Sequence, residues 1–173
     1  MINKASKLLI VCSTLVLFSA CQSTNLSDDT VPQSKNKYVE FIHSGDILPI
    51  KSMTTIEGKE VNLEHIGKKK LVILFATWCS DSNRLLKAMN NSPLLEDETI
   101  EVIAIAREED KETVKKWRQD RNIKVQLAVD LDREIYKKFA SGGIPRLITV
   151  TENNKIIKMN LAEGSEQLKK IVW

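Results

Sequence analysis

The sequence predicts an α/β fold with a mixed central sheet flanked by helices on both faces. Segments with strand-like and helix-like periods alternate from Tyr38 onward, which favours parallel strands connected by helices. An unbroken apolar run at 71–76 is typical of a strand that is covered on both faces, and the mostly apolar segment at 100–106 is expected to be a second buried strand. Near the end of the chain, Asn153-Asn154 separates two strand-like segments and predicts an antiparallel hairpin.

The first half of this domain is expected to contain a hairpin, a buried strand and a helix. Glu57-Gly58-Lys59 is a turn signal between two short strand-like segments, at 54–56 and 60–62. The buried strand at 71–76 is followed by apolar residues at helical spacing, which predict a helix over 82–89.

The second half repeats the alternation and adds the hairpin. A strand is expected at 100–106, a charged helix over 111–121 and a strand at 125–129. Leu131, Ile135 and Phe139 mark a third helical stripe, which Gly142-Gly143 ends. The last expected elements are strands at 146–150 and 156–159 and a short helix opened by Ser165, with Leu168, Ile171 and Val172.

The first 20 residues have the pattern of an export signal. Lys4 and Lys7 give a positive start, and small residues at 19–21 close the segment. The apolar run between them, at 8–18, is too short to span a bilayer, which needs about 20 apolar residues. Residues 1–20 are therefore expected to be a signal peptide.

Phe18-Ser19-Ala20-Cys21 resembles the lipobox of bacterial lipoproteins, with Phe18 at a position that is usually Leu. The resemblance implies that Cys21 is acylated and holds the protein to a membrane of the cell envelope, on the periplasmic side. Gln22 after the cysteine resembles an outer-membrane address. Residues 21–37 are polar without an apolar period, which predicts a flexible tether before a domain at 38–173.

The composition excludes several classes of function. Of the 173 residues, 42% are apolar and 28% are charged, as in an ordinary globular domain. Removing Lys4 and Lys7 from the 26 basic residues leaves 24 against 23 acidic ones, and no basic stripe interleaved with aromatics appears, so nucleic acid is not an expected partner. His43 and His65 are the only histidines, and neither has ligand spacing to a cysteine, so neither a metal nor a cofactor is expected.

One cysteine is left for chemistry. Cys12 leaves with the signal peptide and Cys21 carries the lipid, so Cys79 is the one free thiol. Cys79 lies between a predicted strand and a predicted helix, where unpaired backbone N–H groups and the helix dipole favour the reactive thiolate. Downstream, Ile144-Pro145 precedes a strand, and a cis proline there would lie against the thiol.

Phe75-Ala76-Thr77-Trp78-Cys79 and Gly143-Ile144-Pro145 carry a family resemblance. They are similar to the active-site region and the Gly-Val-Pro segment of TlpA/ResA-like thioredoxin-fold proteins, and 45–63 looks like the N-terminal hairpin of that family. The resemblance covers roughly residues 41–173. It implies a thioredoxin-like fold, thiol–disulfide chemistry at Cys79, shielding of the thiol by Trp78, and substrate contact by Ile144 and Pro145.

The second cysteine of the family motif is missing. Where the family has Cys-x-x-Cys, this chain has Cys79-Ser80-Asp81-Ser82, so it cannot resolve a mixed disulfide by itself. Ser82 is expected to assist by donating a hydrogen bond to the sulfur, which favours the thiolate, whereas the charge of Asp81 disfavours it. Ile73 departs from the buried acid of thioredoxin itself.

Three functions stay open. In the first, Cys79 attacks a disulfide of a protein or a small thiol, and an outside thiol releases the product. In the second, the domain binds an extended partner at Ile144-Pro145 and catalyses nothing. The third is a thiol peroxidase, but Val72 and Ala76 occupy the places of the Pro and Thr in the peroxiredoxin motif. The retained motif favours the first; for Arg146, substrate contact and a surface or sheet-edge role are both open.

Overall fold

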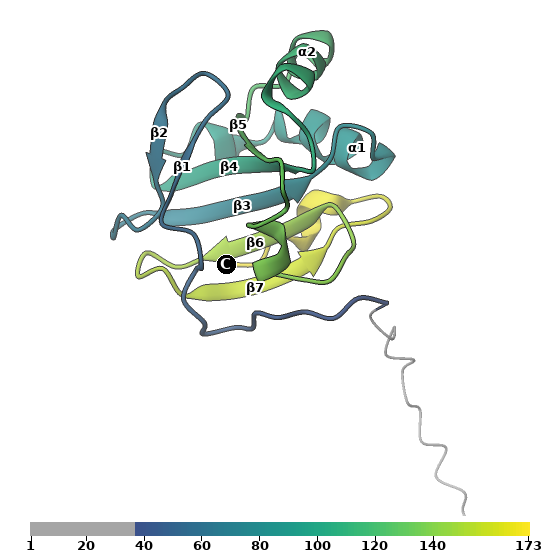
Figure 1. Ribbon diagram of the computed structural model, residues 1–173. Coiled ribbons are helices and arrows are strands. Elements are labelled where there is room, and N and C mark those ends of the chain that lie inside the picture. Colours follow the sequence, from purple (N-terminus) through teal and green to yellow (C-terminus); the bar gives the residue numbers. More distant parts are fainter. Residues whose placement is uncertain (1–36) are drawn as a thin grey trace, which may run out of the picture. The chain divides into compact units, whose positions relative to one another are not determined.

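The computed structural model describes residues 37–173, and the signal peptide, Cys21 and nearly all of the predicted tether lie outside these residues. In the described part, five strands form one mixed sheet in the order β5-β4-β3-β6-β7 (Figure 1). The strands are β3 (Lys69–Phe75), β4 (Ile100–Arg107), β5 (Gln126–Asp130), β6 (Arg146–Val150) and β7 (Ile156–Leu161).

The direction of each strand follows from what connects it to the next. β3, β4 and β5 are parallel because the helices α1 (Ser80–Met89) and α2 (Lys111–Arg121) cross between them. β6 runs antiparallel to β3 and to β7, and the β6–β7 turn contains Asn154 in the left-handed conformation, with φ of 61°. The mixed sheet and the C-terminal hairpin are therefore confirmed.

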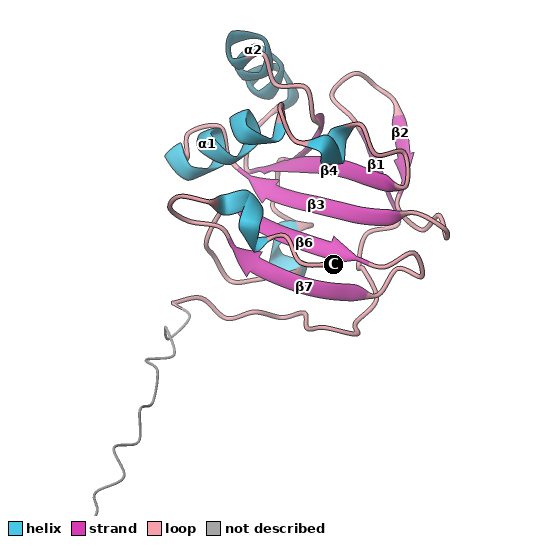
Figure 2. Ribbon diagram, turned by 180° about the vertical axis from the view of Figure 1, so that it is seen from behind, coloured by secondary structure: helices cyan, strands magenta, loops and turns pink. Residues whose placement is uncertain are grey.

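Both α-helices cover the same face of the sheet, which Figure 2 views from the side of α1. Leu85 and Leu86 of α1 and Trp117 of α2 are buried against the side chains of β3 that point to this face. Those side chains alternate along the strand, as the two-residue period requires: Leu71, Ile73 and Phe75.

The opposite face is covered without an α-helix in the described part of the chain. Val72 and Leu74 of β3 pack there against residues 42–50 and against a second, two-stranded sheet of β1 (Ser52–Thr54) and β2 (Glu60–Asn62). The one helical element on this face is a 3₁₀ turn, η2 (Tyr136–Lys138). The sequence predicts helices on both faces of the sheet. Within residues 37–173 the structure has both α-helices on one face and only the 3₁₀ turn η2 on the other.

The predicted third helix is wrong. Leu131 is 63% exposed, and the segment contains only η2. The Asp130 carboxylate accepts hydrogen bonds from the backbone N–H groups of Ile135 and Tyr136, at 2.9 and 2.7 Å, and Arg133 has a left-handed φ of 64°. These side-chain bonds replace the backbone ladder that a continuous helix would need.

The chain ends in a shorter element than predicted. Glu166 is in the left-handed conformation, so the expected helix from Ser165 is reduced to the 3₁₀ helix η3 (Gln167–Lys170). Leu168 and Ile171 still pack against the α-helical side of the sheet. A further 3₁₀ turn, η1 (Pro93–Leu95), follows α1. Over residues 37–173 no helix combines the length and the apolar character needed to cross a membrane.

Candidate active site

Cys79 lies at the N-terminus of α1, as predicted. It is the N-cap residue, with extended φ and ψ of −84° and 121°, and its carbonyl accepts the first hydrogen bond of the helix, from Asn83 N at 3.0 Å. Within residues 37–173 it is the only cysteine, and its side chain is half-buried. The side chain of Cys79 therefore belongs to the end of α1 where the first N–H groups have no partner within the helix, and it remains partly open to solvent.

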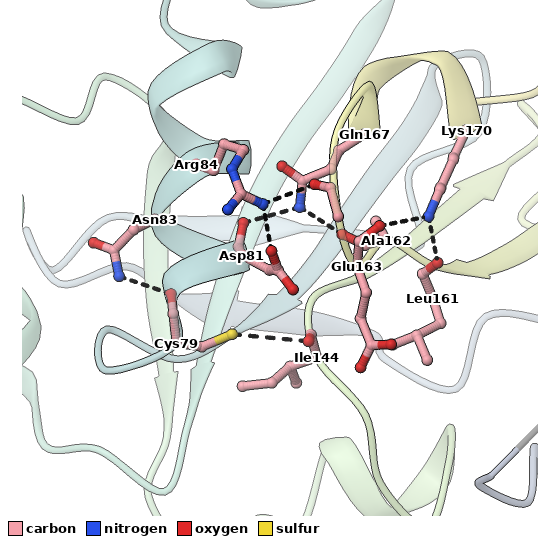
Figure 3. A network of polar contacts seen from close by, with 11 residues as sticks. Cys79, Asp81, Asn83, Arg84, Ile144, Leu161, Ala162, Glu163, Gln167 and Lys170 are labelled. Carbon is pink, nitrogen blue, oxygen red and sulfur yellow. Dashed lines mark hydrogen bonds and ion pairs between the residues drawn. The ribbon is translucent and has the colours of Figure 1, made fainter.

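The structure brings the two predicted motifs together. The Cys79 sulfur lies 3.8 Å from the carbonyl oxygen of Ile144, 65 positions later in the chain (Figure 3). The Ile144-Pro145 peptide bond, whose isomer the sequence leaves open, is cis. Ile144 and Trp78 line the same hollow as the sulfur. Pro145 is buried and is not among the described residues that line this hollow. Trp78 is 66% exposed, so its ring stands at the surface beside the thiol.

Ser82 is fully buried one turn into α1. Its hydroxyl oxygen accepts a weak hydrogen bond from Ala76 N–H, at 3.4 Å. The hydrogen bonds found between residues 37 and 173 do not include one from Ser82 to the sulfur, so assistance to the thiolate by Ser82 stays a prediction.

A carboxylate from another loop holds the chain just before the cysteine. Glu109, between β4 and α2, is only 8% exposed. It accepts a hydrogen bond from Thr77 N at 2.7 Å and another from the Thr77 hydroxyl. From the sequence, the acidic residues Glu108-Glu109-Asp110 indicate only the start of a helix, and Asp110 does cap α2. The inward contact of Glu109 has no signal in the sequence.

A second support comes from α1 and α2. Asn83 donates from its amide nitrogen to the carbonyl oxygens of Thr77 and Cys79, at 2.7 and 2.8 Å. The Trp117 indole N–H donates to the side-chain oxygen of Asn83 at 2.8 Å, and the ring packs against Phe75 at 5.3 Å between centroids. These contacts fix both carbonyls of the reactive loop.

The sulfur opens into a hollow of about 470 Å³. Besides Trp78, Cys79 and Ile144, its lining includes Tyr38 and two arginines, Arg107 and Arg133. Neither arginine belongs to the predicted site, because they reach it from the ends of β4 and β5 rather than through a motif. Asp81 and Glu163 supply acidic groups to the lining.

Arg146 has neither of the roles considered from the sequence. It is 1% exposed, donates to Gly142 O at 2.7 Å and forms an ion pair with Glu40 at 2.7 Å. It therefore binds the Gly142-Gly143 turn to the N-terminal segment from inside the domain.

The described residues hold no cluster of three or more His, Cys, Asp or Glu side chains that could bind a metal. The buried amine of Lys70 is at the opposite end of β3 from Cys79 and donates to His65 O at 2.5 Å. Burial lowers the pKa of Lys70, against the opposing charges of Glu152 and Glu101. This lysine does not reach the hollow around the sulfur.

Residues 44–159 match the model of the AhpC/TSA family. Similar curated proteins include a thiol-disulfide oxidoreductase ResA of Bacillus cereus, 23% identical over 130 residues that cover 74% of this chain and 75% of the relative. ResA of Bacillus thuringiensis subsp. konkukian is 27% identical over 139 residues, covering 76% of this chain and 80% of that protein.

Two solved structures that superpose on this chain are described as thiol–disulfide proteins. A candidate protein disulfide isomerase from Bacteroides thetaiotaomicron superposes with a TM-score of 0.70 at 22% identity, covering 76% of this chain and 87% of the other. A thiol:disulfide interchange protein from Chlorobium tepidum gives 0.59 at 20% identity, covering 69% and 88%. These similarities show the thioredoxin-like fold.

Proposed function

Because this chain belongs to the AhpC/TSA family, we propose that it is a thiol–disulfide oxidoreductase of the cell envelope that acts through Cys79 alone. The observation that carries the proposal is the sulfur at the N-terminus of α1, 3.8 Å from the Ile144 carbonyl and open to a hollow. The similarity to ResA proteins, described as thiol-disulfide oxidoreductases, supports the same chemistry.

The reaction needs two exchanges at one sulfur. In the first, the Cys79 thiolate attacks a substrate disulfide, a new bond forms between Cys79 and one substrate sulfur, and the other substrate sulfur leaves as a thiolate. In the second, the thiolate of an outside thiol attacks the substrate sulfur of this mixed disulfide and returns Cys79 as a thiolate. The substrate sulfur is left in a mixed disulfide with the outside thiol. A second outside thiol then attacks the sulfur of the first, the substrate leaves as a thiolate, and the two outside thiols together supply the two electrons and end as one disulfide.

The residues around Cys79 have separate roles in this proposal. The first turn of α1 stabilises the thiolate, and Ser82 assists by turning its hydroxyl toward the sulfur. Trp78 and Ile144 contact the substrate at the mouth of the hollow, and the backbone beside Pro145 pairs with an extended peptide. With Ser82 in place of a resolving cysteine, the mixed disulfide persists until an outside thiol arrives.

The proposed location depends on residues outside the described part. A signal peptide at 1–20 and acylation of Cys21 would hold the domain on the outer side of a membrane, where protein disulfides occur. Mass spectrometry of the N-terminal peptide of the native protein tests this, because an unmodified Cys21 would contradict a lipid anchor.

The chemistry is tested on the full chain in detergent, with Cys12 and Cys21 replaced by serine so that Cys79 is the sole thiol. Incubation with bis(2-hydroxyethyl) disulfide should add one mercaptoethanol unit to Cys79 by intact mass, and a second thiol should then remove it. Cys79→Ser is the control for non-specific addition. Ser82→Cys should restore internal resolution, so that the adduct no longer accumulates.

Other outcomes would favour the remaining functions. If no adduct forms on Cys79 and Cys79→Ser keeps the cellular function, the domain is a binding module for which the exposed ring of Trp78 offers a contact surface. If Cys79 instead consumes hydrogen peroxide rapidly, the protein is a thiol peroxidase despite Val72 and Ala76 at the peroxiredoxin positions.

A further inference from the structure

Two arginines from different segments meet at one tyrosine beside the reactive cysteine. The guanidinium carbons of Arg107, at the end of β4, and Arg133, after β5, lie 4.7 and 5.1 Å from the centre of the Tyr136 ring. Tyr136 is fully buried, and its hydroxyl donates to Gly143 O at 2.6 Å. Since both arginines line the hollow of Cys79, the Tyr136 ring holds two cationic side chains in the wall of this hollow.

Both guanidinium groups have donors that protein groups do not use. Arg133 donates through one terminal nitrogen to Ser141 O at 2.7 Å, and Arg107 pairs through one with Glu108 at 2.8 Å. The Nε atoms of both are buried without a partner among residues 37–173. A guanidinium carries five N–H donors, so the other terminal nitrogen of each group can donate to a further, negatively charged partner.

The acidic side chains among the described residues that line the hollow do not pair with Arg133. Asp81 is paired with Arg84, which also donates to Gly164 O (Figure 3). Glu163 lines the hollow as well and is exposed. Within the described part of the chain, no carboxylate oxygen lies within 4.0 Å of the Arg133 guanidinium nitrogens. Arg133 is therefore a cation in this wall without an acidic partner.

We infer that this hollow binds a carboxylate of the disulfide substrate, with Arg133 and Arg107 as its partners. The inference rests on the proposed exchange at Cys79 and names its substrate class: disulfides with a carboxylate a few bonds from the sulfur. Such a group occurs in small acidic thiols and in peptides with an acidic residue beside the cysteine. In both, the carboxylate is held by charge-assisted hydrogen bonds while the sulfur faces Cys79.

Binding is tested apart from reaction. The full-length Cys79→Ser chain in detergent, labelled with ¹⁵N, is titrated with 3,3′-dithiodipropionate and, separately, with bis(2-hydroxyethyl) disulfide. The dicarboxylate should shift the Arg107 and Arg133 Nε–H resonances saturably, and the neutral disulfide should not. Equal shifts with both compounds, or none, would overturn the subsite whatever the chemistry of Cys79.

The rate is tested with a charge series. The rate at which Cys79 exchanges is measured by intact mass with three disulfides: 3,3′-dithiodipropionate, bis(2-hydroxyethyl) disulfide and cystamine. Each rate is divided by the rate at which free mercaptoethanol reacts with the same disulfide. The dicarboxylate should be favoured, and Arg133→Gln should reduce that preference roughly fivefold, as for a partly exposed ion pair. Arg121→Gln removes the same charge outside the hollow and should leave the preference unchanged.

Three results separate the explanations. The subsite is overturned if Arg133→Gln and Arg121→Gln lose the preference for the dicarboxylate equally. It is also overturned if Arg133→Gln slows exchange with the neutral disulfide as much as exchange with the dicarboxylate. If no disulfide reacts but the resonances shift, the subsite stands and the proposed exchange fails. In wild type the preference should also fall with rising salt, which needs no variant. Peptide disulfides that differ only by Glu or Gln beside the cysteine then show whether peptides share the preference or only small acidic disulfides do.

Discussion

Glu109→Gln is the sharpest test of how the reactive loop is held. The change keeps the size of a side chain that is 8% exposed but removes its charge and one of its two acceptor oxygens. The glutamine oxygen can still accept from Thr77 N and its amide nitrogen can donate to the Thr77 hydroxyl, so both contacts remain possible but lose the charge that strengthens them. A hydrogen bond to a charged group contributes about 1.5–3 kcal/mol, and because Thr77 is only half-buried the lower end applies.

We therefore expect Glu109→Gln to lower the free energy of unfolding by about 1.5–2 kcal/mol in urea. Glu109→Ala should lower it by about 3 kcal/mol, since both donors of Thr77 lose their partner. The matched control is Glu112→Gln in α2, whose side chain is 79% exposed and pairs with Lys115 at 3.0 Å. It should change stability by less than about 0.5 kcal/mol.

A functional readout separates loop position from overall stability. Glu109→Gln should change the rate of Cys79 alkylation by iodoacetamide under conditions where the domain is still folded, because Thr77 is two residues before the sulfur. In a double-mutant cycle, Thr77→Val and Glu109→Gln should be coupled by about 1 kcal/mol. If Glu109→Gln is no more destabilising than Glu112→Gln and leaves alkylation unchanged, the loop does not depend on this carboxylate.

Three further changes test other parts of the molecule. Trp117→Phe removes the indole donor to Asn83 and should lower the free energy of unfolding by about 1 kcal/mol in urea; an unchanged midpoint would contradict this. In Asp110→Ala the helix cap is lost. Hydrogen bonds from the first turn of α2 hold the pKa of Asp110 below its ordinary value of 3.8. The stabilisation by this carboxylate is therefore present above pH 3.8 and is lost as the pH falls through the pKa of the folded protein. The difference in melting temperature between Asp110→Ala and wild type should accordingly disappear in acid. Gly143 has φ of +85°, and a Cβ there would lie 2.7 Å from the Tyr38 ring, so Gly143→Ala should cost at least about 1–2 kcal/mol by thermal unfolding; a neutral result would mean that the turn relaxes freely.

The sheet could be predicted because its signals are local. The apolar residues at 71–76 and 100–106 indicate strands that are buried on both faces, and Asn153-Asn154 indicates a turn. Each of these signals lies within a few residues of the chain. The prediction of a third helix is wrong although Leu131, Ile135 and Phe139 have helical spacing. The Asp130 carboxylate accepts hydrogen bonds from backbone N–H groups that a helix would use. Spacing does not reveal such a competing side chain.

The site divides in the same way. Cys79, Trp78 and Ile144 belong to motifs whose order along the chain indicates that they meet. Arg107 at the end of β4, and Glu109 and Arg133 in loops, lie near the cysteine only because the sheet brings these segments together. Their positions depend on packing and on left-handed residues such as Arg133, not on a repeat in the sequence.

The place of Tyr38 has a practical consequence for anyone who handles this protein. Its ring fills the space that side chains at Gly142 and Gly143 would need, and it lines the hollow of Cys79. An affinity tag or fluorophore joined just before residue 37 would therefore be attached next to a side chain that lines the hollow of the sulfur. Trp173 lies over Lys69, at the start of β3, whereas Cys79 follows its end. Labels and surface attachment for rate measurements belong after Trp173.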